Sequence, residues 1–218
     1  AFNDPSILVP NALGTVDNQN LHGIRDTEMV VLYPGDMIDA AELFTAHRSQ
    51  ASGIQVEMVD VDHVYNEFGS GAPSPVAIRD FAKMLYDRNP DLKYLMLLGD
   101  ASFDFKNLKN LPSPSNLVPT YETKESLDPI RGFPSDDFYA LLSPGEGSSL
   151  KGALDIAVGR LPAKTSGEAM DMVNKIISYE TNPNRFGDWM NKITFVADDE
   201  DFNIHLNQAD QIAEKLLD

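Results

Sequence analysis

The sequence predicts an α/β fold: a mostly parallel sheet flanked by helices in a Rossmann-like, three-layer arrangement, with an edge hairpin. Short apolar runs alternate with helical patterns and short turns, an order typical of parallel strands joined by right-handed crossovers. The run at 94–98 is apolar and stops at Gly99-Asp100, which indicates a strand buried on both faces. Ligands of such sheets bind beyond the carboxyl ends of the strands, so we expect a site near Asp100.

The first half of the chain supplies three predicted strands and two predicted helices. The strands are the apolar runs 29–33, 54–60 and 94–98. The first helix is expected to begin at a cap formed by Asp36 and to end at Gly53. Ser74 followed by Pro75 predicts the start of the second helix, which should end near residues 89–90. Its apolar residues recur at helical spacing, at Ile78, Phe81, Ala82 and Leu85. Residues 61–73 are expected to form a loop.

The second half of the chain is less regular. Five prolines within residues 101–134 forbid a long helix there, and a loop of this length is usually functional or a lobe junction. Residues 138–142 and 154–158 resemble a hairpin at a sheet edge. Thr165 and Glu168 form a capping box that predicts a helix with one apolar face. A strand at 192–197 and a helix from about Asn203 should follow, with Ala209, Ile212, Ala213 and Leu216 facing inward.

These elements suggest a domain organisation. Residues 1–28 lack periodicity and are interpreted as a linker from a preceding domain, 29–130 as a first α/β subdomain, and 131–218 as the start of a second. The chain begins without methionine, and its last predicted helix has no following strand. We therefore expect the natural protein to be longer. The sequence contains neither a signal-peptide pattern nor an apolar run long enough to span a membrane.

Composition and missing motifs argue against several classes of function and site. The formal net charge of −17 would repel phosphate backbones, so nucleic acid is not an expected partner. The absence of cysteine excludes disulfides, thiolate metal sites and a cysteine nucleophile within these residues. No Gly-x-Ser-x-Gly elbow, dinucleotide fingerprint or Walker A loop follows a predicted strand. The four histidines are scattered and lack metal-ligand spacing.

Carboxylates at predicted strand ends are the remaining candidates for a site. We predict that four of them form a pocket rim: Asp100, Asp104, Asp136 and Asp137. Three more follow the predicted strand 192–197 and could bind calcium through hard oxygen ligands: Asp198, Asp199 and Asp201. The alternative is that these residues only cap helices and loops, as Asp does in any α/β protein.

Several motifs, taken in order, resemble the gingipain-type cysteine peptidases of family C25. In that family a strand ends in Gly-Asp, a Ser-Asp-x-x-Tyr segment follows a loop, and a Gly-Arg turn leads to a helix ending in Tyr-Glu. The corresponding residues here are Gly99-Asp100, Ser135-Asp136-Asp137-Phe138-Tyr139, Gly159-Arg160 and Tyr179-Glu180. The segment from Asn18 to His22 is similar to the one that enters this domain in the sortase branch of the family.

This resemblance implies a caspase-like fold and a cysteine endopeptidase or sortase of the type IX secretion system. Such an enzyme would process secreted proteins at the bacterial outer-membrane surface. The family's His/Cys dyad, with its histidine in a Gly-His-Gly context, matches no residues here, so we expect the dyad beyond Asp218 and the fragment alone to be inactive. Implied partners are protein or peptide substrates and the remaining C-terminal part of the domain. No cofactor is required, although calcium stays an option.

Two alternatives come from other functional classes. One is a non-catalytic α/β binding or scaffold module whose acidic rim holds a divalent ion, calcium being the candidate. The other is a phosphoacceptor receiver domain, suggested by Asp100 at a strand end. That second alternative is disfavoured because Tyr33-Pro34-Gly35 follows the first strand where a paired acidic cluster is needed.

Overall fold

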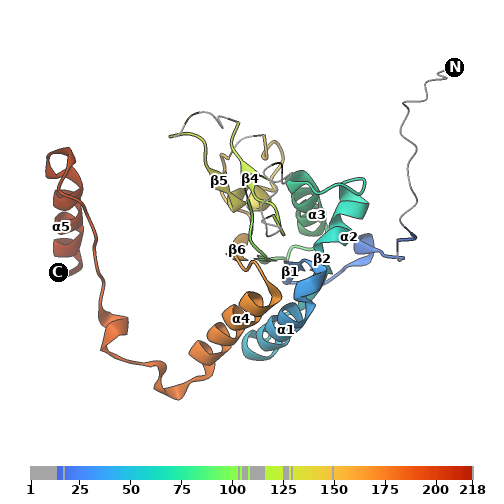
Figure 1. Cartoon of the computed structure of the whole chain (residues 1–218), viewed down its shortest axis with the longest axis horizontal. Helices are drawn as coiled ribbons and strands as arrows, with labels where there is room; N and C mark the ends of the chain where they lie inside the picture. The colour runs from blue at the N-terminus through green and yellow to red at the C-terminus, as the bar shows by residue number, and fades with distance from the viewer. Residues whose placement is uncertain are drawn as a thin grey trace. The chain divides into compact units, whose positions relative to one another are not determined.

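The computed structural model describes residues 14–16, 18–102, 104, 108, 116–124, 128, 130–148 and 150–217. The chain forms two compact units, Ala1–Lys175 and Ile176–Asp218. The first unit contains a four-stranded sheet in the order β2-β1-β3-β6 (Figure 1). Its strands are β1 (Met29–Tyr33), β2 (Val56–Asp60), β3 (Tyr94–Leu98) and β6 (Ala157–Leu161). The predicted boundary between residues 130 and 131 stays a prediction.

All neighbouring strands of this sheet are parallel. Met29 lies opposite both Val56 and Tyr94, and Tyr94 lies opposite Ala157, so the four strands start at nearly the same level. Every residue of β1, the apolar run 29–33, is buried. Because the four strands run in the same direction from nearly the same level, their carboxyl ends meet at one edge of the sheet, as the sequence predicts.

Helices cover both faces of the sheet, which confirms the α/β class with flanking helices. The helix α1 (Ile38–Ser52) lies on one side, and α2 (Val61–Phe68) and α3 (Pro75–Arg88) lie on the other (Figure 1). Alternate strand residues, such as Val30 and Leu97, belong to the core that also contains Phe81 of α3. This alternation follows from the two-residue period of a strand.

The helix boundaries follow local signals, with two corrections. Gly53 ends α1 in the left-handed region, at φ 67°, as predicted from the conformational freedom of glycine. Asp36 does not cap α1; it lies in the 3-10 turn η2 (Gly35–Met37), and Met37 is the N-cap. Residues 61–68, predicted as a loop, form α2, because the side chain of Asp60 accepts a hydrogen bond from the amide of Asp62.

The hairpin predicted for residues 138–142 and 154–158 is wrong in its residues. Asp136–Ala140 forms the 3-10 helix η3, and the second run shifts to β6, which pairs parallel to β3 as the last strand of the described sheet. The error arises because an apolar run indicates burial and not the type of element. Phe138 and Tyr139 are buried here although they lie in a 3-10 helix. A small antiparallel pair does exist, formed by β4 (Tyr121–Glu122) and β5 (Pro134–Ser135).

The segment before β1, predicted as a linker, is attached to α2 where the structure describes it. It contains the 3-10 turn η1 (Leu21–Gly23). The carboxylate of Glu67 accepts hydrogen bonds from the Leu21 amide at 2.8 Å and the Gln19 side chain at 3.0 Å, and it contacts His22 Nδ1 at 2.7 Å. The His22 ring stacks on Phe68. Residues 1–13 and 17, also predicted as linker, lie outside the described residues.

The helix α4 (Ser166–Thr181) begins as its sequence predicts. The hydroxyl of Thr165 accepts a hydrogen bond from the amide of Glu168, and the Glu168 carboxylate accepts one from the amide of Lys164. This arrangement is a capping box in which the Glu168 carboxylate binds the amide of Lys164, the residue before the cap, instead of the amide of Thr165 itself. Ala169 and Val173, the first apolar positions of the predicted helix face, are buried.

The second unit is described by itself. After α4 it contains three 3-10 turns, η4 (Pro183–Arg185), η5 (Asp188–Asn191) and η6 (Asp201–Asn203), and the helix α5 (Ile204–Leu217). The strand predicted at 192–197 is wrong for the described chain: these residues pair with no other strand there. Ala209 and Ala213 are half-buried, whereas Ile212 and Leu216 are exposed, so the predicted inward face is largely open.

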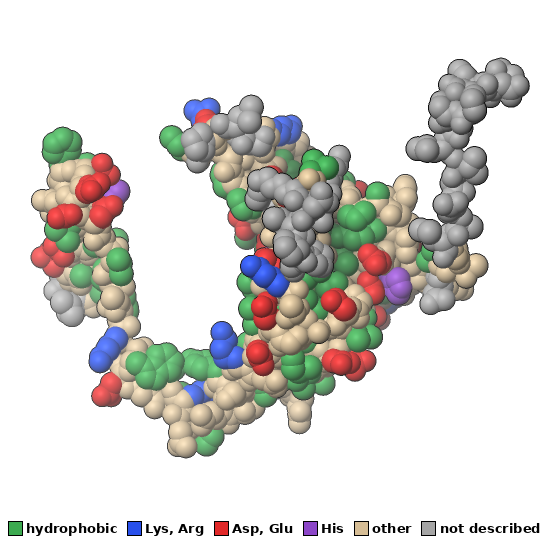
Figure 2. Space-filling view, in the orientation of Figure 1, with side chains coloured by type: hydrophobic (Ala, Val, Ile, Leu, Met, Phe, Trp, Pro, Cys, Tyr) green, Lys and Arg blue, Asp and Glu red, His purple; other side chains and the backbone are tan. Residues whose placement is uncertain are grey.

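The surface agrees with the acidic composition. Acidic side chains are spread over several elements of the face shown in Figure 2 rather than gathered on one. No helix among the described residues is both long enough and apolar enough to cross a membrane.

Candidate functional site

The carboxyl edge of the sheet carries the segment that follows β3. Gly99 adopts φ 131°, and a Cβ there would approach the side chains of Leu117 and Val118 at 3.1 and 3.2 Å. A glycine is therefore required where the chain leaves the strand. The Asp100 amide donates to the carbonyl of Ala163 at 2.8 Å, and the Asp100 carbonyl accepts from Leu117 and Val118.

The side chain of Asp100 is only loosely paired. Its Oδ2 lies 3.9 Å from Nζ of Lys164, whose side chain is 60% exposed. An ion pair of this length and exposure contributes little to stability. The backbone of Asp100 thus contributes to holding this edge together, while its carboxylate makes only this one weak contact. Asp100 is not among the described residues that line the pocket below, so its place on a pocket rim stays a prediction.

Arg160, the next-to-last residue of β6, organises this edge. Its guanidinium makes a bidentate pair with Asp136, with both N–O distances at 2.7 Å. It also donates to three carbonyl oxygens, those of Gly99 at 2.8 Å, Val118 at 2.6 Å and Pro119 at 3.1 Å. A planar guanidinium suits this task because its donors point in fixed directions. The Gly-Arg pair predicted as a turn therefore lies within a strand.

Two further side chains complete the network around Arg160. The hydroxyl of Thr120 donates to Oδ1 of Asp136 at 2.9 Å. The hydroxyl of Tyr139, which is fully buried, donates to the carbonyl of Pro119 at 2.5 Å. Burial raises the pKa of the Tyr139 hydroxyl well above its ordinary value, so it stays protonated and acts as a donor.

The other two rim candidates have local roles in the structure. Oδ1 of Asp104, a buried residue, accepts a hydrogen bond from the amide of Leu108 at 2.8 Å. Asp137 is exposed, and its amide donates to the hydroxyl of Ser135. The structure brings Asp100 and Asp136 to the same edge of the sheet, since Arg160 donates to the carbonyl of Gly99, the neighbour of Asp100, and to the carboxylate of Asp136. Ligand contact by any of the four residues stays a prediction.

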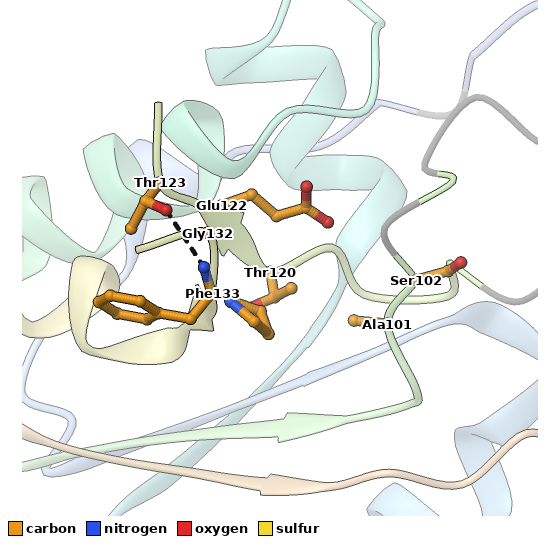
Figure 3. A pocket seen from close by; sticks show the side chains of 8 residues that line it. Ala101, Ser102, Thr120, Glu122, Thr123, Gly132 and Phe133 are labelled. Carbon is orange, nitrogen blue, oxygen red and sulfur yellow. Dashed lines mark hydrogen bonds between the residues drawn. The ribbon is translucent and has the colours of Figure 1, made fainter. Parts of the chain in front are cut away.

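A pocket of about 720 Å³ opens beside this network (Figure 3). One wall is the segment after β3, with Ala101 and Ser102, and the other is the β4–β5 hairpin. The hairpin contributes six lining residues: Thr120, Glu122, Thr123, Gly132, Phe133 and Pro134. Figure 3 shows the hydrogen bond that the amide of Phe133 donates to the hydroxyl of Thr123. Its length is 3.2 Å, and it joins the residue after β4 to the residue before β5.

The pocket offers both polar and apolar contacts. Among the described lining residues Glu122 alone carries an ionisable side chain, next to the hydroxyls of Thr120 and Thr123. The ring of Phe133, which is 49% exposed, and Pro134 supply apolar surface. Such a mixture could accept an extended peptide through hydrogen bonds and apolar contact.

Sequence reasoning did not single out Arg160 or Glu122 as site residues. A signal for Arg160 was present, because a charged residue inside an otherwise apolar strand usually has a fixed partner. Glu122 carried no such signal, since an isolated acidic residue in a proline-rich loop is usually solvated. Its place in the pocket depends on the pairing of β4 with β5.

The acidic segment predicted to bind calcium belongs to the second unit. Nδ1 of His205 lies 3.0 Å from Oδ1 of Asp198 and 4.0 Å from Oδ2 of Asp201. Asp199 is exposed. In the part of the chain that the structure describes, no three acidic, histidine or cysteine side chains are grouped as metal ligands. Calcium binding by Asp198, Asp199 and Asp201 stays a prediction.

Comparison with known proteins agrees with the resemblance seen in the motifs. The crystal structure of dimeric latent PorU from Porphyromonas gingivalis matches with a TM-score of 0.65 and 26% identity over 86% of this chain. This chain spans 18% of that PorU chain. The complex of Porphyromonas gingivalis RgpB pro- and mature domains matches with a TM-score of 0.49 and 20% identity, covering 71% of this chain and 29% of that one.

No curated protein matches the sequence. The family model described as Peptidase family C25, however, matches residues 24–218, which is nearly the whole chain. The motifs that suggested this family, from Gly99-Asp100 to Tyr179-Glu180, all lie inside the matched region. The chain therefore belongs to peptidase family C25.

Proposed function

We propose that this chain is the N-terminal part of the catalytic domain of a PorU-type cysteine endopeptidase, a sortase that processes secreted proteins at the bacterial outer-membrane surface. The observation that carries the proposal is the C25 match over residues 24–218. The structural likeness to PorU, at 26% identity, supports the PorU branch. The pocket at the carboxyl edge of the sheet supports ligand binding where α/β folds usually place it.

The 218 residues contain no cysteine. The thiolate of a cysteine peptidase would therefore come from residues other than these, together with the histidine that shuttles its proton. In such an enzyme the thiolate attacks the scissile carbonyl, and backbone amides stabilise the oxyanion. The role proposed for this chain is to supply the parallel sheet and one pocket wall. Hydroxyls of Thr120 and Thr123 and the carboxylate of Glu122 would contact the peptide.

The proposal can be tested on the full-length natural protein. We expect it to cleave fluorogenic peptides, or a secreted protein that carries a C-terminal sorting signal, and to lose this activity on thiol alkylation with iodoacetamide. The 218-residue chain, which has no thiol to alkylate, serves as the matched control and should show no cleavage. A full-length sequence without a cysteine, or cleavage that resists alkylation, would contradict the proposal.

A further inference from the structure

Arg160 joins three chain segments that are far apart in sequence. Its guanidinium donates to Gly99 directly after β3, to Val118 and Pro119 before β4, and to Asp136 after β5. These are the segments that lead into the pocket walls, because Ala101, Thr120 and Pro134 line the pocket within two residues of them. One side chain is therefore bonded to the segments that lead into both walls.

Three hydrogen bonds engage both oxygens of the Asp136 carboxylate. Its Oδ2 accepts from Nε of Arg160, and its Oδ1 accepts from Nη2 of Arg160 and from the hydroxyl of Thr120. The side chains of Arg160 and Asp136 are only 12% and 22% exposed. Charge-assisted bidentate bonds shielded from water are among the strongest hydrogen bonds in proteins. A ligand at this carboxylate would compete with the Arg160 guanidinium, which already bonds to both oxygens.

The pocket itself is lined by a different carboxylate. Glu122 lines it, whereas neither Asp136 nor Arg160 does. Thr120 connects the two groups, since it lines the pocket and donates to Asp136. The carboxylate of Asp136 thus acts on the pocket through Thr120 and Arg160 and does not reach it directly.

We propose that Arg160 and Asp136 are positioning residues that hold the segment after β3 and the β4–β5 hairpin around the pocket, and that Asp136 does not recognise cationic substrate groups. This inference rests on the proposed function for its link to peptide cleavage. The geometric part stands on the hydrogen bonds alone. Two measurements on the full-length protein separate the two parts.

The first measurement is hydrogen exchange in Arg160→Gln. Amides in residues 116–124 and 130–136 should exchange about tenfold faster or more, the factor expected when one charge-assisted hydrogen bond is lost, while amides of β1 should keep their protection. Arg131→Gln is the matched control. It removes an arginine from the connection between β4 and β5, where exchange is measured, but the side chain of Arg131 is 76% exposed. Unchanged exchange at the hairpin, or equal acceleration throughout the sheet, would overturn the positioning role.

The second measurement is the kinetics of Asp136→Asn on peptides that differ only in having a lysine, an arginine or a neutral residue at each position. We expect kcat/KM to fall by the same factor for all peptides, mainly through KM, because the pocket wall is misplaced for every ligand. Arg131→Gln should match the parent. A loss confined to lysine and arginine peptides would show direct recognition and refute the proposal. If the parent cleaves nothing, the proposed function fails, and hydrogen exchange still decides the positioning role.

Discussion

Asp155 is the residue whose substitution tests the fold most sharply. Its Oδ2 accepts hydrogen bonds from the amides of Leu142 at 2.7 Å and Ser143 at 2.8 Å. Its Oδ1 accepts from the hydroxyls of Ser143 at 2.9 Å and Tyr86 at 3.2 Å. One carboxylate therefore joins α3, the turn after η3 and the residues that lead into β6. We expect Asp155→Asn to weaken all three connections.

The size of this effect follows from the donors. The amide oxygen of asparagine can replace Oδ2, but it carries no charge, and hydrogen bonds to a charged acceptor contribute about 1 kcal/mol more than neutral ones. The two hydroxyl donors can rotate toward water. With two backbone donors affected, we expect a loss of about 2 kcal/mol in the free energy of unfolding. Asp137→Asn is the matched control, because its carboxylate makes no hydrogen bond among the described residues, and its change should stay within about 0.5 kcal/mol.

The effect should depend on pH. Partial burial by itself raises the pKa of the Asp155 carboxyl, but the hydrogen bonds from Leu142, Ser143 and Tyr86 outweigh it, and the pKa lies below its ordinary value. A lowered pKa in the folded state stabilises the protein above the unfolded pKa of about 4, and this contribution is lost as pH falls through the folded value. The difference between parent and variant should be full at pH 7 and shrink below about pH 4.

Urea unfolding at pH 7 and pH 3 measures this difference. The single tryptophan, Trp189, lies in the second unit, so the first unit should be followed by far-UV circular dichroism or by hydrogen exchange in β1 and β3. A stability of Asp155→Asn within about 0.5 kcal/mol of the parent at pH 7 would refute the role given to this carboxylate. A full difference that persists at pH 3 would refute the pH argument.

Three further predictions concern the core, the segment before β1 and calcium. Phe81→Ala should lower the free energy of unfolding by about 3–5 kcal/mol in urea titrations, because Phe81 is fully buried, while Val76→Ala, at a 54% exposed position of the same helix, should change it little; similar losses in both would contradict the assigned core. Glu67→Gln should speed hydrogen exchange at the Leu21 amide, since the charged acceptor is lost; unchanged exchange there would show that Glu67 does not hold the segment. If calcium binds the acidic segment, Ca²⁺ should raise the Tm of the parent and leave Asp198→Asn unchanged, and a parent Tm unaffected by Ca²⁺ would remove the calcium hypothesis.

Local signals were sufficient for the elements that position the site. The apolar runs predicted β1 and β3 with their observed bounds, and Ser74-Pro75 predicted the start of α3. A signal of the same kind was overlooked for α2, because Asp60 followed by Val61, Val64 and Tyr65 is a cap with helical spacing. These features depend on neighbours within one or two turns, so they can be read without knowing the fold.

The motifs of the family were also present in the sequence, and the family match confirms what they indicated. The sequence by itself therefore determined the fold class, the parallel direction of the first three strands, the edge of the sheet at which their carboxyl ends meet, and family membership. The order of the strands in the sheet came from the structure. Its apolar runs could not distinguish a strand from a 3-10 helix at Phe138 and Tyr139, because both conformations bury the same side chains.

Only the tertiary structure decided which carboxylate pairs with which cation. Asp100 and Asp136 looked equivalent in the sequence, yet one meets an exposed lysine at 3.9 Å and the other an enclosed arginine at 2.7 Å. Arg160 reaches Asp136 because β6 pairs in register with β3, which aligns Arg160 with Leu97 next to the end of β3. Pairing between strands sets such distances, and a one-residue change of register would turn Arg160 to the opposite face of the sheet.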